Sequence, residues 1–229
     1  MNYLLRFSML VQIRIVAGGI RRRTGPAMRI SVLGTGHMGR TLGEGFSKAG
    51  HDVVYGSRTP EEQTGLPGPA VSYAEAAAGS DVVLSALAAA HSLEVLTPLR
   101  DHLSGRVLID IGNAVNGQMD LIYPDSSLGE RLQRALPETQ VVKTLSTVGG
   151  PIGINPAQLS APTNVFLSGD DAEAKAVVSG LLADLGWEPD RQVDLGGIAT
   201  ARAVEHYFLL FAALMGALRT PAFNIAVTR

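Results

Sequence analysis

From Met28 onward, short apolar runs alternate with longer segments whose apolar residues recur at helical spacing. Alternating strand and helix units of this kind predict an α/β fold built on a parallel sheet. Most of the apolar runs are rich in Val, Ile and Leu, which suits strands that are buried on both faces. The predicted strands are residues 29–33, 52–55, 82–86, 107–111, 141–144 and 164–167.

Helices are predicted between these runs, at residues 37–49, 91–102, 127–135 and 171–185. Residues 198–218 form one further long helix with a wide apolar face. That face either packs onto the parent domain, or it forms a cleft wall or a contact with a second subunit. Its uninterrupted apolar run, residues 207–218, is shorter than the roughly 20 residues that a bilayer span needs.

Composition narrows the class of protein. The chain has 229 residues, of which 46% are hydrophobic and 17% charged, too apolar for a disordered chain. It has no cysteine, which excludes disulfides, cysteine-based metal sites and thiol nucleophiles. The absence of cysteine fits a reducing compartment, so we expect a cytoplasmic protein.

Charge is distributed unevenly along the chain. Residues 1–27 contain five arginines and no acidic residue, whereas residues 28–229 contain 14 basic and 21 acidic residues, a net charge of −7. An acidic domain argues against nucleic-acid binding, which depends on basic residues. Arg14 interrupts the apolar run near the start, so we expect no membrane span there. We predict a basic, disordered extension at residues 1–27, with a targeting or membrane-surface role as the alternative, and a nucleotide-binding domain at residues 28–229.

A glycine-rich motif follows the first predicted strand and opens the first predicted helix. It reads G-x-G-x-x-G, and the strand at 52–55 completes a β-α-β unit around it. The first glycine permits a tight turn, the second lets the backbone approach a pyrophosphate, and the third lets helix and strand pack closely. Backbone N–H groups at the helix start favour an anion. The motif predicts dinucleotide binding; the alternative is a tight turn with no ligand. Its residues are Gly34, Thr35, Gly36, His37, Met38 and Gly39.

The end of the second strand indicates which dinucleotide is bound. An NAD enzyme places an Asp or Glu there for the ribose 2'-hydroxyl, but this chain has Ser57 and Arg58. A hydroxyl and a guanidinium suit a 2'-phosphate, which favours NADP. The alternative is that Arg58 is a solvated loop residue.

Other chemistries leave little trace in the sequence. The histidines lack H-E-x-x-H spacing and no G-x-S-x-G motif occurs, so we expect neither a metal site nor a serine hydrolase. His51, His102 and His206 are expected at the surface or at helix ends. Glu205 and His206 are neighbours on a helix and point about 100° apart, so they do not form a dyad.

Three blocks of the chain resemble one known family, the NADPH-dependent reductases of the deazaflavin coenzyme F420. They are MRISVLGTGHMGRTLGEGFSKAGHDVVYGSR, VVKTLSTV and DLGGIATARAVEHYFLLFAALMGALRTPAFNI, and the last is the most specific. The resemblance implies a Rossmann-like, doubly wound, mostly parallel sheet with a long C-terminal helix. It also implies that NADP lies across the carboxyl ends of the strands, and that F420 stacks on the nicotinamide in a cleft closed by the C-terminal part.

The resemblance assigns roles to particular residues. The glycine-rich motif would hold the pyrophosphate, while Ser57 and Arg58 match the family's 2'-phosphate contacts. Ala86 and Leu87 would lie near the nicotinamide ribose, and Asn113 would line that pocket. Hydride passes directly between two ring carbons, so we assign no catalytic acid or base.

The leading hypothesis is therefore a cytoplasmic oxidoreductase that transfers a hydride between NADP(H) and F420 or a related acceptor. A second hypothesis is reduction of a small imine or ketone, which needs a proton donor; Tyr207, Lys143 and His91 are its candidates. A third is a non-catalytic NADP-binding sensor. The apolar C-terminal helix favours a homodimer.

Overall fold

A computed structural model describes residues 25–228 of the chain. The predicted extension, residues 1–27, lies almost entirely outside the described residues. The division of the chain at Met28 therefore stays a prediction.

The centre of the molecule is a six-stranded sheet in which every neighbouring pair of strands is parallel. Its strand order is β3-β2-β1-β4-β5-β6, so the chain moves outward from β1 in one direction and then, from β4, in the other. This order confirms the Rossmann-like, doubly wound prediction. The strands are β1 (Arg29–Leu33), β2 (Asp52–Ser57), β3 (Ala70–Ser72), β4 (Val82–Ser85), β5 (Val107–Asp110) and β6 (Gln140–Lys143).

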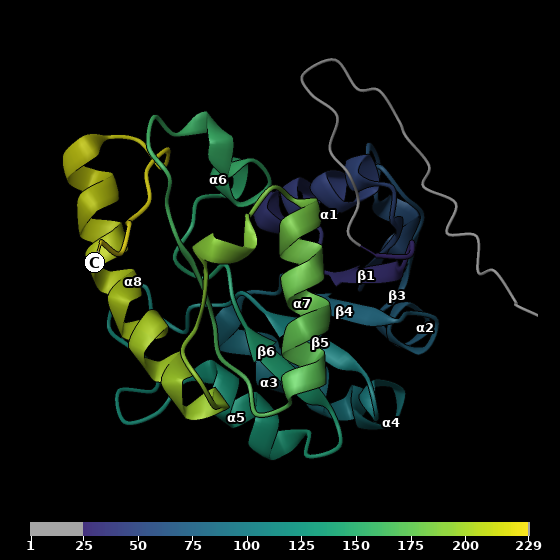
Figure 1. Cartoon of the computed structure of the whole chain (residues 1–229). Helices are drawn as coiled ribbons and strands as arrows, with labels where there is room; N and C mark the ends of the chain where they lie inside the picture. The colour runs from purple at the N-terminus through teal and green to yellow at the C-terminus, as the bar shows by residue number, and fades with distance from the viewer. Residues whose placement is uncertain (1–24, 229) are drawn as a thin grey trace, which may run out of the picture.

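Helices cover both faces of the sheet, and α8 runs along its β6 side next to α5 (Figure 1). The α-helices are α1 (His37–Ala49), α2 (Tyr73–Ala78), α3 (Ser92–Leu96), α4 (Arg100–Leu103), α5 (Leu128–Ala135), α6 (Gly150–Gly153), α7 (Ala172–Asp184) and α8 (Ala201–Leu218). Short 3-10 helices occur at Pro60–Glu62, Ala89–His91, Thr97–Leu99, Pro156–Gln158, Pro189–Arg191 and Ile198–Thr200.

The sheet separates two hydrophobic cores. On one face, side chains of α1, α6 and α7 pack against Ile30 and Val32 of β1 and the strands beside it. On the other face, side chains of α2, α3 and α5 pack against Leu33, Val83 and Leu108. Successive residues of one strand thus enter different cores, which is why the strands are apolar throughout rather than alternating.

Local sequence sets where several helices begin. Ser127 accepts a hydrogen bond from the Glu130 N–H (3.0 Å) and caps α5, and Asp171 accepts one from the Ala174 N–H (2.7 Å) and caps α7. The helix predicted at 91–102 is instead broken into α3, a 3-10 turn and α4. Pro98 lies at the break, and proline lacks the N–H that a continuous helix requires.

The elements that the sequence pattern did not reveal are short: β3, α2, α6 and β8 (Gln192–Asp194), which forms a second sheet with the predicted strand β7 (Val165–Leu167). That sheet pairs β7 with β8 in parallel and meets β6 through hydrogen bonds between Lys143 and Ser168. His51, expected at the surface or at a helix end, directly follows the C-cap of α1 and so lies at a helix end. It is nevertheless buried, with its ring 3.2 Å from the Asp184 carboxylate.

Helix α8 is partly embedded in the domain and partly exposed. Val204, Glu205 and Phe211 are buried, whereas Leu210 and Leu218 are more than half exposed. Among the described residues, Ile198–Leu218 is one helical segment long and apolar enough to cross a membrane. The chain after α8 returns to the domain, where the Ile225 carbonyl accepts the Asn164 N–H (3.1 Å). The predicted packing onto the domain therefore holds for the buried residues of α8, while a cleft wall or a subunit contact at its exposed residues stays a prediction.

Candidate cofactor site

The glycine-rich turn joins β1 to α1 at the carboxyl edge of the sheet. Gly34 has a φ of 111°, a left-handed conformation that favours glycine, and its N–H donates to the Gly56 carbonyl of β2 (3.1 Å). A Cβ at Gly34 would lie 2.6 Å from the Ala86 carbonyl oxygen, and one at Gly39 would lie 2.1 Å from the Gly34 carbonyl oxygen. These two glycines hold β1, α1 and the end of β4 in close contact.

Gly36 has a different environment. It is exposed, its φ is −72°, and a Cβ placed on it would meet no protein atom within 4 Å. Neither chain conformation nor protein packing explains a glycine here. A ligand that approaches the backbone does explain it, as the sequence motif predicts.

The start of α1 offers hydrogen-bond donors to an anion. Gly36 is the N-cap, no side chain caps the helix, and the first turn contains no acidic residue. Uncapped N–H groups together with the helix dipole favour a negative charge. The Arg40 guanidinium donates to the Thr35 carbonyl (2.8 Å) and to the Thr64 carbonyl (3.0 Å), which ties the turn to the loop after β2. The turn is therefore shaped before any anion binds.

Of the remaining motif residues, His37 is exposed at the helix start, whereas Met38 is half-buried and packs into the core beneath α6. The Met38 sulfur lies 3.2 Å from where a Cβ at Gly150 would be. Met38 can therefore offer a ligand its backbone N–H but not its side chain.

Ser57 and Arg58 lie at the end of β2, beside the glycine-rich turn. Ser57 is buried and its hydroxyl accepts the Thr59 N–H (3.2 Å). The Arg58 side chain is exposed, and within residues 25–228 it forms no hydrogen bond or ion pair. A free guanidinium next to a dinucleotide turn can bind a phosphate through two parallel hydrogen bonds.

Ala86, Leu87 and Asn113 follow β4 and β5, the next two strands in the sheet order. The Ala86 N–H donates to the Leu33 carbonyl (2.9 Å), which places it against the glycine-rich turn, and Leu87 is half-buried beside it. The Asn113 Nδ2 donates to the Ser146 carbonyl (2.6 Å), while its Oδ1 is buried with no partner in the described structure. All predicted site residues thus lie along one edge of the sheet, across the point where the strand order reverses.

A buried cluster of three charged side chains lies at the same edge, and the sequence reasoning missed it. Lys143 ends β6, Asp110 ends β5 and Glu205 lies on α8. The Lys143 Nζ is 2.9 Å from Asp110 Oδ2 and 2.9 Å from Glu205 Oε1, and it also donates to the Gly112 carbonyl. The sequence did contain one signal for this cluster: Asp110 and Lys143 are charged residues at the ends of two strands that are otherwise mostly apolar.

Burial and mutual attraction act in opposite directions within this cluster. Burial by itself lowers the pKa of Lys143, but the Asp110 and Glu205 carboxylates outweigh it, so the pKa of Lys143 lies above its ordinary value. Burial raises the pKa of Glu205, Lys143 lowers it incompletely, and Asp110 raises it further; the pKa of Glu205 is raised overall. Lys143 remains charged at neutral pH and has no free proton donor for a substrate.

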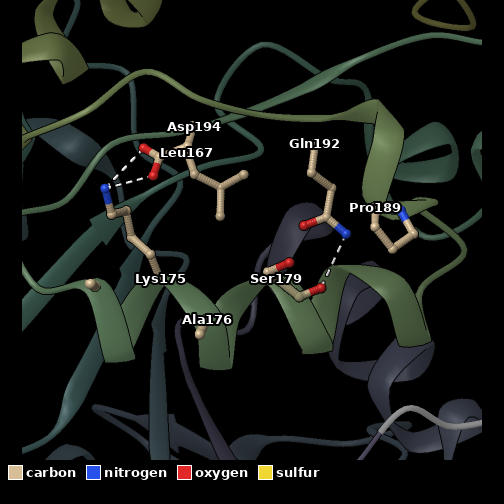
Figure 2. Close-up of a pocket in the computed structure, with 8 residues that line it drawn as sticks. Leu167, Lys175, Ala176, Ser179, Pro189, Gln192 and Asp194 are labelled. Carbon is tan, nitrogen blue, oxygen red and sulfur yellow. Dashed lines mark hydrogen bonds and ion pairs between the residues drawn. The ribbon is translucent and has the colours of Figure 1, made fainter.

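Two surface pockets lie elsewhere, and none of the predicted cofactor residues lines either of them. One, of about 280 Å³, lies between α7 and β8, with the ion pair of Lys175 and Asp194 (2.8 Å) on one side (Figure 2). The other, of about 490 Å³, is lined by residues between 133 and 140 together with Asp170 and Asp171. Within residues 25–228, no group of three or more His, Asp or Glu side chains could hold a metal ion.

A doubly wound sheet with a glycine-rich turn at its switch point defines a dinucleotide-binding domain, and comparison with known proteins places that domain in a class of oxidoreductases. The sequence model of the family described as "NADP oxidoreductase coenzyme F420-dependent" matches residues 29–114. A crystal structure from Arthrobacter sp. FB24, provisionally assigned as an F420-dependent NADP reductase, is 36% identical. The match covers 89% of this chain and 100% of that one with a TM-score of 0.81. The chain belongs to the F420-dependent NADP oxidoreductase family.

Two curated relatives differ in how much of their length matches. The F420-dependent NADP reductase of Methanocaldococcus jannaschii is 26% identical over 200 residues, which cover 78% of this chain and 88% of the relative. The metalloreductase STEAP3 of Rattus norvegicus is 30% identical over 181 residues, again 78% of this chain. This chain spans 36% of that metalloreductase, so the likeness concerns one part of the larger protein.

Proposed function

We propose that this protein transfers a hydride between NADP(H) and coenzyme F420. The observation that carries the proposal is the 36% identity to the Arthrobacter protein, because the match covers 89% of this chain and all of that one and so extends well beyond the nucleotide-binding half. We choose F420 as the acceptor because the family model and the Methanocaldococcus jannaschii relative both carry F420 in their names.

The residues at the sheet edge fit NADP. Gly36 leaves open space at an uncapped helix start, which suits the pyrophosphate, and the unpaired Arg58 suits the 2'-phosphate. The buried, unpaired Oδ1 of Asn113 is an acceptor for which the carboxamide N–H₂ of a nicotinamide is a matching donor. Ala86 and Leu87 would form an apolar wall between the pyrophosphate and the nicotinamide of NADP.

When bound, NADPH supplies the hydride, and the protein contributes position. Gly34 to Gly39 and Arg58 would anchor the phosphates, and Asn113 would orient the nicotinamide ring relative to the acceptor. The hydride leaves the nicotinamide ring carbon for a ring carbon of the deazaflavin, and the one proton that the reduced deazaflavin also takes up can come from solvent, so we assign no catalytic acid or base.

The test is to mix the purified protein with NADPH and oxidised F420 and to follow the deazaflavin absorbance. We expect turnover that depends on both. Tight NADPH binding without turnover would contradict the F420 assignment and favour an NADP-binding sensor. A chelated metal ion is assayed in parallel because one relative is a metalloreductase.

Replacing Arg58 with Ala tests the cofactor assignment separately. Since a charge-assisted hydrogen bond contributes about 1.5–3 kcal/mol and Arg58 is exposed, we expect NADPH affinity to fall about tenfold while NADH affinity stays unchanged. Arg191→Ala is the matched control, because within residues 25–228 the Arg191 side chain pairs with its neighbour Asp190 (3.3 Å), and the residue lies in the 3-10 helix before β8, outside the proposed cofactor site. Equal losses for both cofactors would refute the 2'-phosphate role.

Imine or ketone reduction is the second candidate, and one observation bears on it. Of its three candidate proton donors, Lys143 is enclosed by its carboxylates and His91 is exposed next to Glu94 (3.7 Å). The Tyr207 hydroxyl is buried with no partner in the described structure, and burial raises the pKa of Tyr207. If an imine is reduced, Tyr207→Phe should abolish that activity and leave F420 reduction intact.

The exposed apolar residues of α8 also suit a subunit contact. We propose a homodimer that covers Leu209, Leu210, Met215 and Leu218, in a cytoplasmic protein. Sedimentation of the wild-type chain and of Leu210→Glu tests the dimer.

A further inference from the structure

The buried charged cluster holds one short loop from both sides. Asp110 Oδ1 accepts the Gly112 N–H (3.0 Å), and the Lys143 ammonium donates to the Gly112 carbonyl. The backbone of Gly112 therefore has both of its polar groups bound to charged side chains. The loop after β5 cannot shift without breaking a hydrogen bond to a buried charge.

Asn113 comes directly after this clamped glycine. Its Nδ2 is bound to the Ser146 carbonyl, on the loop after β6, where Leu145 has a left-handed φ of 55°. Such a backbone conformation is costly for leucine and persists only where the surroundings impose it. The unpaired Oδ1 of Asn113 is thus presented by two loops that are both held in place.

Glu205 connects the cluster to the C-terminal helix. Its carboxylate accepts the N–H groups of Leu128 (2.9 Å) and Gly129 (3.1 Å) at the start of α5 and also contacts the Lys143 ammonium. The loop after β5, the start of α5 and α8 consequently share one set of hydrogen bonds. Moving α8 would disturb Gly112 through Lys143.

Stability alone does not account for such a cluster. Desolvating three charges is expensive, and well-packed apolar residues of similar size are often equally or more stabilising. The cluster also lies at the carboxyl edge of the sheet, next to the proposed cofactor site. In either hydrophobic core, the same desolvation cost would serve no function. Both facts indicate that its role is geometric.

We propose that Lys143, Asp110 and Glu205 are positioning residues that hold Gly112 and Asn113, and with them the nicotinamide end of NADP, in fixed relation to α8. The proposal rests on the proposed NADP binding. It requires the cluster to act on the nicotinamide end of the cofactor and not on the phosphate end, which is held by different strands.

The test compares two ligands by calorimetry: NADP⁺ and 2'-phospho-ADP-ribose, which has the same phosphates and no nicotinamide. For Lys143→Met we expect about a tenfold loss of NADP⁺ affinity and less than a twofold change for 2'-phospho-ADP-ribose. Lys175→Met is the matched control, because it removes the same ammonium group from the ion pair with Asp194, and both ligands should bind it as they bind the wild type. An unchanged ratio of the two dissociation constants in Lys143→Met overturns the proposal.

A second variant keeps the test decisive if Lys143→Met fails to fold. Lys143→Met combined with Asp110→Asn leaves one carboxylate, so the cluster keeps its net charge, and Glu205 retains its hydrogen bonds to α5. The Gly112 carbonyl still loses its donor. We expect the same selective loss of NADP⁺ affinity; a wild-type ratio in this variant refutes the positioning role. A wild-type protein that binds neither ligand would refute the proposed function itself.

Discussion

Gly36 and Gly39 belong to one motif, yet the structure predicts opposite results when each is replaced with alanine. A Cβ at Gly39 would lie 2.1 Å from the Gly34 carbonyl oxygen, against a practical minimum of 3.0 Å, so α1 and the turn would have to separate by about 0.9 Å. A Cβ at Gly36 meets no protein atom within 4 Å, and the φ of −72° is open to alanine. Gly39→Ala should therefore disturb the folded protein, whereas Gly36→Ala should disturb only a bound ligand.

The expected magnitudes follow from these contacts. Overpacking against backbone, which cannot rotate away, costs about 1–3 kcal/mol, so Gly39→Ala should lower the free energy of unfolding by that amount without any ligand present. Gly36→Ala changes an N-cap residue and should cost about 1 kcal/mol or less. A methyl group between the backbone and a pyrophosphate should nevertheless weaken NADP⁺ binding at least about tenfold, or about 1.4 kcal/mol.

The assays are urea unfolding of the ligand-free variants and calorimetric titration with NADP⁺. Gly25→Ala is a matched control, because a Cβ there also meets nothing within 4 Å and the residue lies outside the motif. Wild-type NADP⁺ affinity in Gly36→Ala would refute the assignment of this turn to the pyrophosphate. Wild-type stability in Gly39→Ala would refute the packing reasoning.

Two further predictions concern stability. Burial raises the pKa of Tyr55 from 10.0 to about 12, with Arg40 opposing and Glu44 adding to the effect. The folded state therefore holds this proton more tightly than the unfolded chain, so its contribution is complete below pH 10 and is lost as the pH rises to 12, by up to about 3 kcal/mol. Tyr55→Phe should lose correspondingly less stability across this interval in urea unfolding, and an identical pH dependence would contradict the prediction. Lys143→Met should cost about 3–5 kcal/mol because it strands two buried carboxylates, whereas Lys175→Met, at an exposed pair, should cost about 0–1 kcal/mol; equal thermal shifts would contradict this difference.

Local rules account for most of the elements that the sequence predicted correctly, and also for one that it predicted wrongly. The helix at His37–Ala49 begins and ends at the predicted residues because Gly36 precedes it and Gly50, with a φ of 94°, terminates it. Five of the six strands of the central sheet were predicted, because double burial makes them apolar along their whole length, whereas the three-residue strand β3 was missed. The helix expected at residues 91–102 was wrong for a local reason as well, since Pro98 interrupts it and the apolar spacing outweighed that signal in the prediction.

The candidate site also has parts that local sequence predicts and parts that it does not. The glycine-rich turn and the Ser57-Arg58 pair are contiguous segments, so the sequence alone predicts phosphate binding by each of them. The structure brings them to the ends of the neighbouring strands β1 and β2. The motif also predicted which glycine serves packing and which serves a ligand, and the structure adds the distances to the Ala86 and Gly34 carbonyl oxygens that impose the packing roles.

The sequence by itself determined the order of the longer strands and helices, the dinucleotide motif and the resemblance to one reductase family, because each is encoded in contiguous residues. Only the tertiary structure joined Lys143, Asp110 and Glu205, which are separated by up to 95 positions and belong to two strands and the last helix. The reason is physical: buried charges require partners, but any of several distant acids could have provided them, and only the folded packing selects which ones do.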